Sequence, residues 1–261
     1  MLIKKKTADF VTWALIAGGG LACLRAAFYF PLAQADFRLG ALVLVTILFG
    51  SRLQIQIPKT KIHFSIADAL VFLSLLLYGG ALAVLLAAAE ALYTSTQFKY
   101  KGINIKTRTI VLNGAIAALT TSVTALAANY FFAPLAETIK HGETNMFVKL
   151  VALMVVTQFV CNSALVAFFA AEKTNQPFTR VWHEYCTNTF VIYLACALFA
   201  CFMLKVAQGF DLLQLLAGLV VVGITYATYR RYVDDIRRTS AQAEQAEDRK
   251  SSCRERVCTL V

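Results

Sequence analysis

The fold is decided by LLQLLAGLVVVGITYATY (Leu212 to Tyr229), which runs directly into RRYVDDIRRTSAQAEQAEDRK (residues 230–250). The apolar half is long enough to cross a bilayer, because ~20 helical residues rising ~1.5 Å each span the ~30 Å hydrocarbon core. The second half is rich in helix formers and too polar to stay in lipid. With no Pro or Gly after Gly223, the stretch predicts one continuous helix that leaves the membrane as a stiff rod.

The exit helix also carries a seam for self-association. Its less polar positions follow the 3, 4, 3, 4, 3 spacing of a heptad repeat: Tyr226, Tyr229, Val233, Ile236, Ser240 and Ala243. We therefore expect a parallel homodimer that couples the membrane bundle to whatever follows it. The alternative is a solvated, partly frayed helix with a chance stripe. The predicted organisation is a transmembrane bundle (1–229), a cytoplasmic signalling helix (230–250) and a disordered tail (251–261).

Composition places most of the remaining chain in lipid. Of 261 residues, 59% are hydrophobic and only 15% are charged, against about 25% charged in a typical soluble domain. The net charge of +10 is spread in short clusters between apolar spans, so nucleic acid is not an expected partner. The seven cysteines are not expected to form a disulfide framework. A zinc site at Cys253 and Cys258 is not expected either, because no His lies near them in the sequence.

Apolar spans recur along the whole chain and predict an all-α, polytopic membrane bundle of about eight transmembrane helices. The spans are 10–30, 39–53, 65–78, 81–98, 109–132, 149–171, 186–206 and 212–229. The third and fourth are short and meet at Gly79-Gly80, so this pair is either two crossings or an oblique, partly re-entrant hairpin. Residues 54–64 alternate apolar and polar side chains, which indicates an extended or interfacial segment.

Eight spans with an inside N-terminus give a regular charge alternation. The segments then placed inside hold most of the 25 Lys and Arg residues, whereas those placed outside hold only Arg38, Lys140, Lys149 and Lys205. Positive loops stay in the cytoplasm, so both termini are expected there.

Polar residues within the spans are the candidates for a site, because an ionisable group at mid-membrane costs at least ~2.5 kcal/mol. Arg25 either holds an anion or snorkels to the headgroups. Asp68 either completes a capping box with Ser65 or contacts a ligand. Glu90 has no such local explanation. A tentative ligand pocket, with interhelical hydrogen bonding as the alternative, would comprise Arg25, Asp68, Glu90, Asn113, Asn162 and Asn188.

No catalytic motif accompanies these residues. The chain has no His-Glu-x-x-His, Walker or Gly-x-Ser-x-Gly sequence, and its three histidines fall in three separate loops. Gly18-Gly19-Gly20 lacks the strand-turn-helix context of a phosphate loop and instead favours close helix packing. We therefore expect no enzyme active site, no metal and no cofactor.

Three stretches resemble the N-terminal membrane halves of bacterial cyclic-di-GMP signalling proteins of the HD-GYP phosphodiesterase and GGDEF cyclase type. They are SRLQIQIPKTKIHFSIADALVFLSLLLYGGALAVLLAAAEALYTS (51–95), NGAIAALTTSVTALAANYFF (113–132) and ITYATYRRYVDDIRR (224–238). The resemblance implies a membrane sensor in the bacterial inner membrane whose exit helix continues into an effector. No HD pair, GYP or GGDEF sequence follows Ala246, so the effector is expected to be absent.

Two functional hypotheses follow. The first is a membrane-embedded signal-input or anchoring module that relays to a cytoplasmic effector, with membrane lipid and a second copy of the chain as partners. The second is the substrate-binding membrane component of a vitamin-like transporter, which residues 64–89 also resemble. A truncated gene product without activity is a third option.

Overall fold

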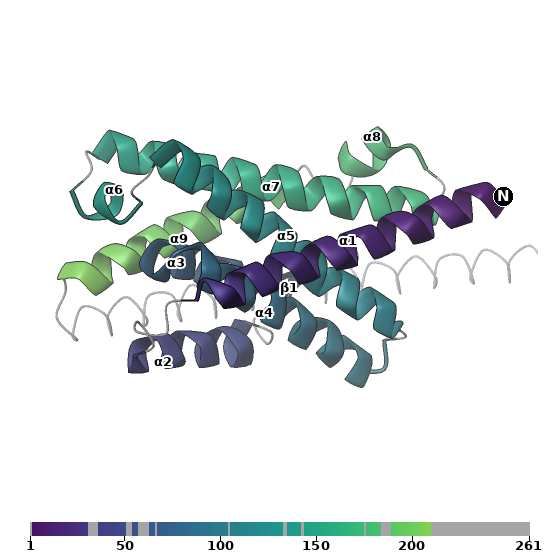
Figure 1. Ribbon diagram of the computed structural model, residues 1–261, viewed down its shortest axis with the longest axis horizontal. Helices are drawn as coiled ribbons and strands as arrows, with labels where there is room; N and C mark the ends of the chain where they lie inside the picture. Colours follow the sequence, from purple (N-terminus) through teal and green to yellow (C-terminus); the bar gives the residue numbers. More distant parts are fainter. Residues whose placement is uncertain are drawn as a thin grey trace, which may run out of the picture. The chain divides into compact units, whose positions relative to one another are not determined.

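The computed structural model describes residues 2–30, 36–50, 54–56, 63–65, 67–103, 105–132, 135–141, 144–174, 176–183 and 189–209 (Figure 1). The eighth predicted span, the exit helix with its dimer seam and the tail lie outside these residues, and they remain predictions. The chain divides into two units, Met1–Leu204 and Lys205–Val261. The fold described below is that of the first unit; residues 205–209, which end the last described helix, belong to the second.

The described residues are predominantly helical, which confirms the predicted helical bundle. The elements are α1 (Leu2–Phe28), α2 (Phe37–Val45), the π-helical turn η2 (Thr46–Gly50), β1 (Gln54–Gln56), β2 (His63–Ser65), α3 (Ala67–Tyr78), α4 (Gly80–Tyr100), α5 (Thr107–Phe132), α6 (Leu135–His141), α7 (Thr144–Thr174), α8 (Phe178–Val181) and α9 (Thr189–Gly209). The strands β1 and β2 pair antiparallel, with Ile55 opposite Phe64. The alternation of apolar and polar residues over 54–64 therefore predicted the extended structure that is found in β1 and β2.

Four of the described helices are long and apolar enough to cross a membrane: residues 9–28 of α1, together with α4, α5 and residues 144–172 of α7. The apolar helices at 37–48, 67–78 and 189–205 are shorter. Of the eight predicted spans, four are thus supported by length and composition. Within the third and fourth spans, α4 has 21 residues and reaches this length, whereas α3 has 12 and does not. The backbone turns between them at Gly79, whose φ of 86° suits glycine.

Helix α5 is central to the packing and contacts α1, α4 and α7, while α3 packs on α4 (Figure 1). Close approach depends on small residues. A Cβ on Gly19 would lie 2.5 Å from the Cα of Ala115, and a Cβ on Gly80 would lie 2.6 Å from the Cβ of Ala125. A Cβ on Gly20 would meet nothing within 4 Å. The Gly18-Gly19-Gly20 run therefore allows α1 to approach α5 closely, as predicted. The residue that makes this approach possible is the middle one, Gly19.

The starts of α1 and α5 lie at the same end of the bundle. Arg108, in the first turn of α5, forms an ion pair with the Asp9 carboxylate, and its guanidinium lies 5.5 Å from the centre of the Trp13 ring. Because Gly19 meets Ala115 further along both helices, α1 and α5 run parallel. This agrees with the charge alternation, which places the N-terminus and the basic 99–108 segment on one side.

The described helices have a buried apolar core and, in addition, many hydrophobic side chains that face outward. The core includes Leu75, Leu150 and Met154, each at most 2% exposed. Many large apolar side chains, such as Phe28 at 84% and Tyr130 at 83%, face outward. Such extensive exposed apolar surface is compatible with a lipid environment.

Candidate functional site

A polar cavity of about 50 Å³ lies between α3, α4, α5, α7 and α9. Its apolar lining comes from Val71, Ala87 and Ala117. The rest of its lining is polar: Asp68, Glu90, Thr120, Thr121, Gln158, Asn162 and Tyr193. Because a single water requires at least ~10–15 Å³, this volume accommodates a few waters or a small ion.

The cavity lies near mid-depth of the bundle. Glu90, Thr120 and Gln158 fall near the middles of α4, α5 and α7, respectively. The short helix α3 starts beside them, so Asp68 reaches the cavity from the first turn of that helix. The partial positive charge of a helix N-terminus favours a carboxylate at this position. The Ser65 side chain is outside the described residues, so the predicted capping box itself remains untested.

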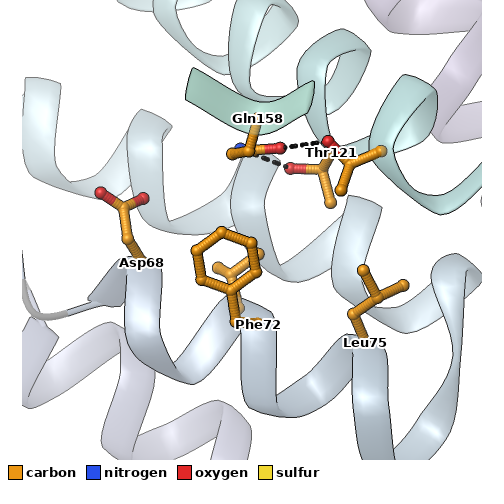
Figure 2. Close-up of a pocket in the computed structure, with 7 residues that line it drawn as sticks. Asp68, Phe72, Leu75, Thr121 and Gln158 are labelled. Atoms are coloured by element: carbon orange, nitrogen blue, oxygen red, sulfur yellow. Dashed lines mark hydrogen bonds between the residues drawn. The ribbon is translucent and has the colours of Figure 1, made fainter. Parts of the chain in front are cut away.

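Gln158 connects α7 to three threonines of α5. Its Oε1 accepts a 2.8 Å hydrogen bond from Thr124 Oγ1, and its Nε2 donates long bonds of 3.4 Å to Thr121 Oγ1 and 3.5 Å to Thr120 Oγ1. Figure 2 shows Gln158 reaching toward the α5 hydroxyls, with Asp68 and Phe72 nearby. All three threonines are 1% exposed. This network therefore stays inside the bundle.

A second connection joins α7 to α9. Asn162 Nδ2 donates a 2.6 Å hydrogen bond to the phenolic oxygen of Tyr193. The Tyr193 ring also packs edge-on against Phe159, with 6.4 Å between ring centres. Tyr193 is 4% exposed. The cavity wall thus includes a fixed residue of the last described helix.

Two carboxyl groups, those of Asp68 and Glu90, line the site. Glu90 Oε1 accepts a 2.8 Å hydrogen bond from Thr94 Oγ1, and Asp68 lies on the neighbouring helix α3. No Lys, Arg or His lines the cavity among the residues that the structure describes. The described lining therefore combines two acidic side chains with several neutral oxygen acceptors.

A smaller adjoining cavity of about 10 Å³ lies between Asp68, Phe72, Leu75, Thr121 and Gln158 (Figure 2). Val71, Phe72 and Leu75 supply its apolar lining, and its volume matches a single water at most. It extends the polar cavity toward the core without adding another charged group.

The structure brings together three of the six predicted site residues, namely Asp68, Glu90 and Asn162. Asn113 instead donates a 2.9 Å hydrogen bond to Ser95 of α4, which is the interhelical bonding that sequence analysis gave as the alternative. Arg25 is exposed in the last turn of α1 and does not line the cavity. Asn188 lies outside the described residues.

Sequence reasoning missed Thr120, Thr121, Gln158 and Tyr193. Uncharged polar residues are common in membrane helices, so no single one of them marks a site. The available signal was positional, because Thr120, Thr121 and Thr124 share one stretch of α5. Three hydroxyls so close together in an apolar span bond either carbonyls of their own helix or polar side chains of a neighbouring helix.

Fold and site together define a helical bundle of the membrane-protein type with a small, acidic, polar cavity near its mid-depth. Comparisons with protein-family models, curated proteins and solved structures find no match to this chain. No three His, Cys, Asp or Glu side chains group as a metal site within the described part of the chain.

Proposed function

We propose that this chain is a signal-input module of the bacterial inner membrane, with both termini in the cytoplasm. In this proposal, occupancy of the polar cavity alters the bundle, and the exit helix passes that change to a cytoplasmic effector of the cyclic-di-GMP type. Dimerisation through Tyr226, Tyr229, Val233, Ile236 and Ala243 would align two exit helices for this purpose.

The observation that carries the proposal is the position of Tyr193. This residue lines the cavity and is held by Asn162. It also lies on α9, the helix after which the chain continues into the predicted exit segment. A change in cavity occupancy therefore acts on the helix that precedes the output.

The transporter alternative requires room for a vitamin-sized substrate. Ligand pockets for organic molecules typically measure ~300–1,000 Å³, whereas the space in this cavity is about 50 Å³. The size of the cavity therefore favours the sensor over a carrier of organic substrates.

Disulfide crosslinking in native membranes tests the relay. A single cysteine is placed at Val233 or Ile236 in a variant whose seven cysteines are replaced by serine, with and without Tyr193→Phe. We expect a crosslinked dimer whose yield changes when Tyr193 loses its hydroxyl. Tyr130→Phe is the control, because Tyr130 is 83% exposed and does not line the cavity.

Two results would oppose the proposal. No dimer at either position removes the predicted seam. A dimer whose yield is the same in Tyr193→Phe, in Tyr130→Phe and in the parent variant with both tyrosines removes the link between cavity and exit helix. Deletion of residues 234–261 then distinguishes the signal-input module from the transporter component. A transporter component retains ligand binding and coupling to its partner without the cytoplasmic helix, whereas a signal-input module loses its output.

A further inference from the structure

We propose that the turn between α4 and α5 binds the phosphate headgroups of anionic phospholipids at the membrane surface. Residues 99–103 and 105–108 form this basic turn, which carries Lys99, Lys101 and Lys106. The inference rests on the membrane placement in the proposed function, and it assigns a partner to a surface outside the polar cavity.

The backbone of the basic turn has a defined conformation. Helix α4 ends in a Schellman motif, in which the amide of Gly102 donates to the Lys99 carbonyl at 3.2 Å and the amide of Ile103 donates to the Phe98 carbonyl at 3.1 Å. Gly102 has a φ of 86°, which suits glycine at this position. Helix α5 begins at Thr107. The three lysines are therefore carried on a short segment that is fixed by the helices on either side of it.

The lysines of the basic turn carry positive charge that the described protein does not neutralise. Lys99, Lys101 and Lys106 are exposed, and no carboxylate among the described residues forms an ion pair with them. Arg108 differs, because its guanidinium is paired with Asp9 and so joins α5 to α1.

Helix α1 adds further positive charge at the same end of the bundle. Its residues 4–6 are all lysines and precede Asp9. The start of α1 and the turn between α4 and α5 lie at one end of the bundle (Figure 1). Clusters of several lysines beside a membrane helix attract anionic lipids. An anionic partner would therefore balance the charge at this end.

Exposed apolar side chains beside the basic turn indicate which anionic partner fits. Tyr100 and Ile103 in the turn are exposed, as are Phe10 and Trp13 on α1. The Trp13 ring lies against the Arg108 guanidinium. Aromatic side chains of this kind gather at the headgroup level of a membrane. The combination of lysines with exposed aromatic rings favours a phospholipid headgroup over an acidic protein.

Quenching of Trp13 fluorescence by brominated lipids tests the site in vesicles. The chain has two tryptophans, so the full chain with Trp182→Phe retains Trp13 alone. It is reconstituted in phosphatidylcholine vesicles that contain an equal minor fraction of brominated phosphatidylglycerol or brominated phosphatidylcholine. The affinity for phosphatidylglycerol relative to phosphatidylcholine should exceed about fivefold, the contribution of one lysine near an anionic lipid.

Two double variants locate the preference. Lys101→Gln with Lys106→Gln should reduce it by more than half. Arg38→Gln with Lys149→Gln is the matched control, because it removes the same charge from exposed residues near the starts of α2 and α7. The control should retain the preference of the parent protein.

Salt separates a lipid headgroup from free phosphate. NaCl at about 500 mM should weaken the preference by screening the lysines. Inorganic phosphate at the same ionic strength should weaken it no more than NaCl does, because free phosphate lacks the acyl chains that keep a lipid in the membrane beside Trp13.

A second measurement covers the loss of the Trp182 hydrogen bond to Ser163. If Trp182→Phe fails to fold, the thermal unfolding midpoint of the chain with both tryptophans is measured in uncharged detergent. Phosphatidylglycerol at about ten times its Kd should raise the midpoint by about 3–6 °C, and phosphatidylcholine should raise it less.

Three results would overturn the lipid site: equal effects of the two lipids, a preference retained in Lys101→Gln with Lys106→Gln, or displacement of the lipid by inorganic phosphate. The first result would favour an acidic protein as the partner of the basic turn. Crosslinking at Val233 separates this inference from the proposed function. A lipid preference with a crosslink that ignores Tyr193→Phe retains the site and refutes the relay, whereas a responsive crosslink without lipid preference does the reverse.

Discussion

Asn162 and Tyr193 join α7 to α9 through a 2.6 Å hydrogen bond at the wall of the polar cavity. Both residues also line the space that contains the two carboxyl groups. The bond therefore connects the acidic cavity directly to the last described helix.

Tyr193→Phe should destabilise the bundle by about 0.6–1.7 kcal/mol, the range for hydrogen bonds between membrane helices. The cost arises because Asn162 Nδ2 loses its acceptor in a buried position. Unfolding by SDS titration in bicelles measures it, with Tyr130→Phe as the matched control. A cost below that of the control would show that the bond contributes nothing to stability.

Gly19→Ala should destabilise the protein by about 1–3 kcal/mol, the usual cost of overpacking. The new Cβ would lie 2.5 Å from the Cα of Ala115, so α1 must move away from α5. Gly20→Ala is the control, because its Cβ meets nothing within 4 Å, and better helix propensity should leave it neutral or slightly more stable. The same SDS titration compares them. Equal effects at both positions would contradict the α1–α5 packing.

Gln158→Leu should change stability by less than about 1.5 kcal/mol, as expected for a volume-conserving change. The reason is that two of the three threonines retain backbone acceptors: Thr124 Oγ1 also donates to the Thr120 carbonyl at 2.9 Å, and Thr120 Oγ1 donates to the Ala117 carbonyl at 3.1 Å. Gln158→Ala should cost more, because it leaves an unfilled space in the core. Unfolding free energies of the two variants decide the point, and a larger loss for Leu than for Ala would contradict this account.

Asp9→Asn should reduce stability by less than about 1 kcal/mol, and less again at high salt, because the ion pair with Arg108 is half exposed. Arg108→Ala should cost more, since it also removes the contact with the Trp13 ring. Unfolding at 50 mM and 500 mM NaCl, with Glu137→Gln as the exposed control, measures both. A salt-independent cost for Asp9→Asn above that range would show that the carboxylate has a buried role.

The fold could be read from sequence where hydrophobicity was continuous. Each of the first seven predicted spans overlaps a described helix, and Gly79 does form the turn between α3 and α4. Boundaries were less accurate: α7 begins at Thr144, within the segment predicted as an outer loop. That segment also contains α6 (Leu135–His141), because its mixed charges hid a short helix.

The residues of the cavity could be predicted from the sequence only in part. Whether a polar residue lines the cavity depends both on its depth along the helix and on the helix face that carries it. Asp68, Glu90 and Asn162 were correctly grouped by their polarity within apolar spans. Arg25 and Asn113 were grouped with them on the same grounds, yet one faces outward and the other bonds Ser95. Hydropathy shows how deep a residue lies, whereas the face that it presents depends on how α1, α4 and α5 pack.

We propose that these helices cross a membrane with the starts of α1 and α5 on its cytoplasmic face. Single cysteines at Lys5, Ile103 and Glu137, in the variant without native cysteines, are labelled with a membrane-impermeant maleimide in intact spheroplasts and in inverted vesicles. We expect positions 5 and 103 to react only in inverted vesicles and position 137 only in spheroplasts. Labelling of positions 103 and 137 from the same side would contradict the account.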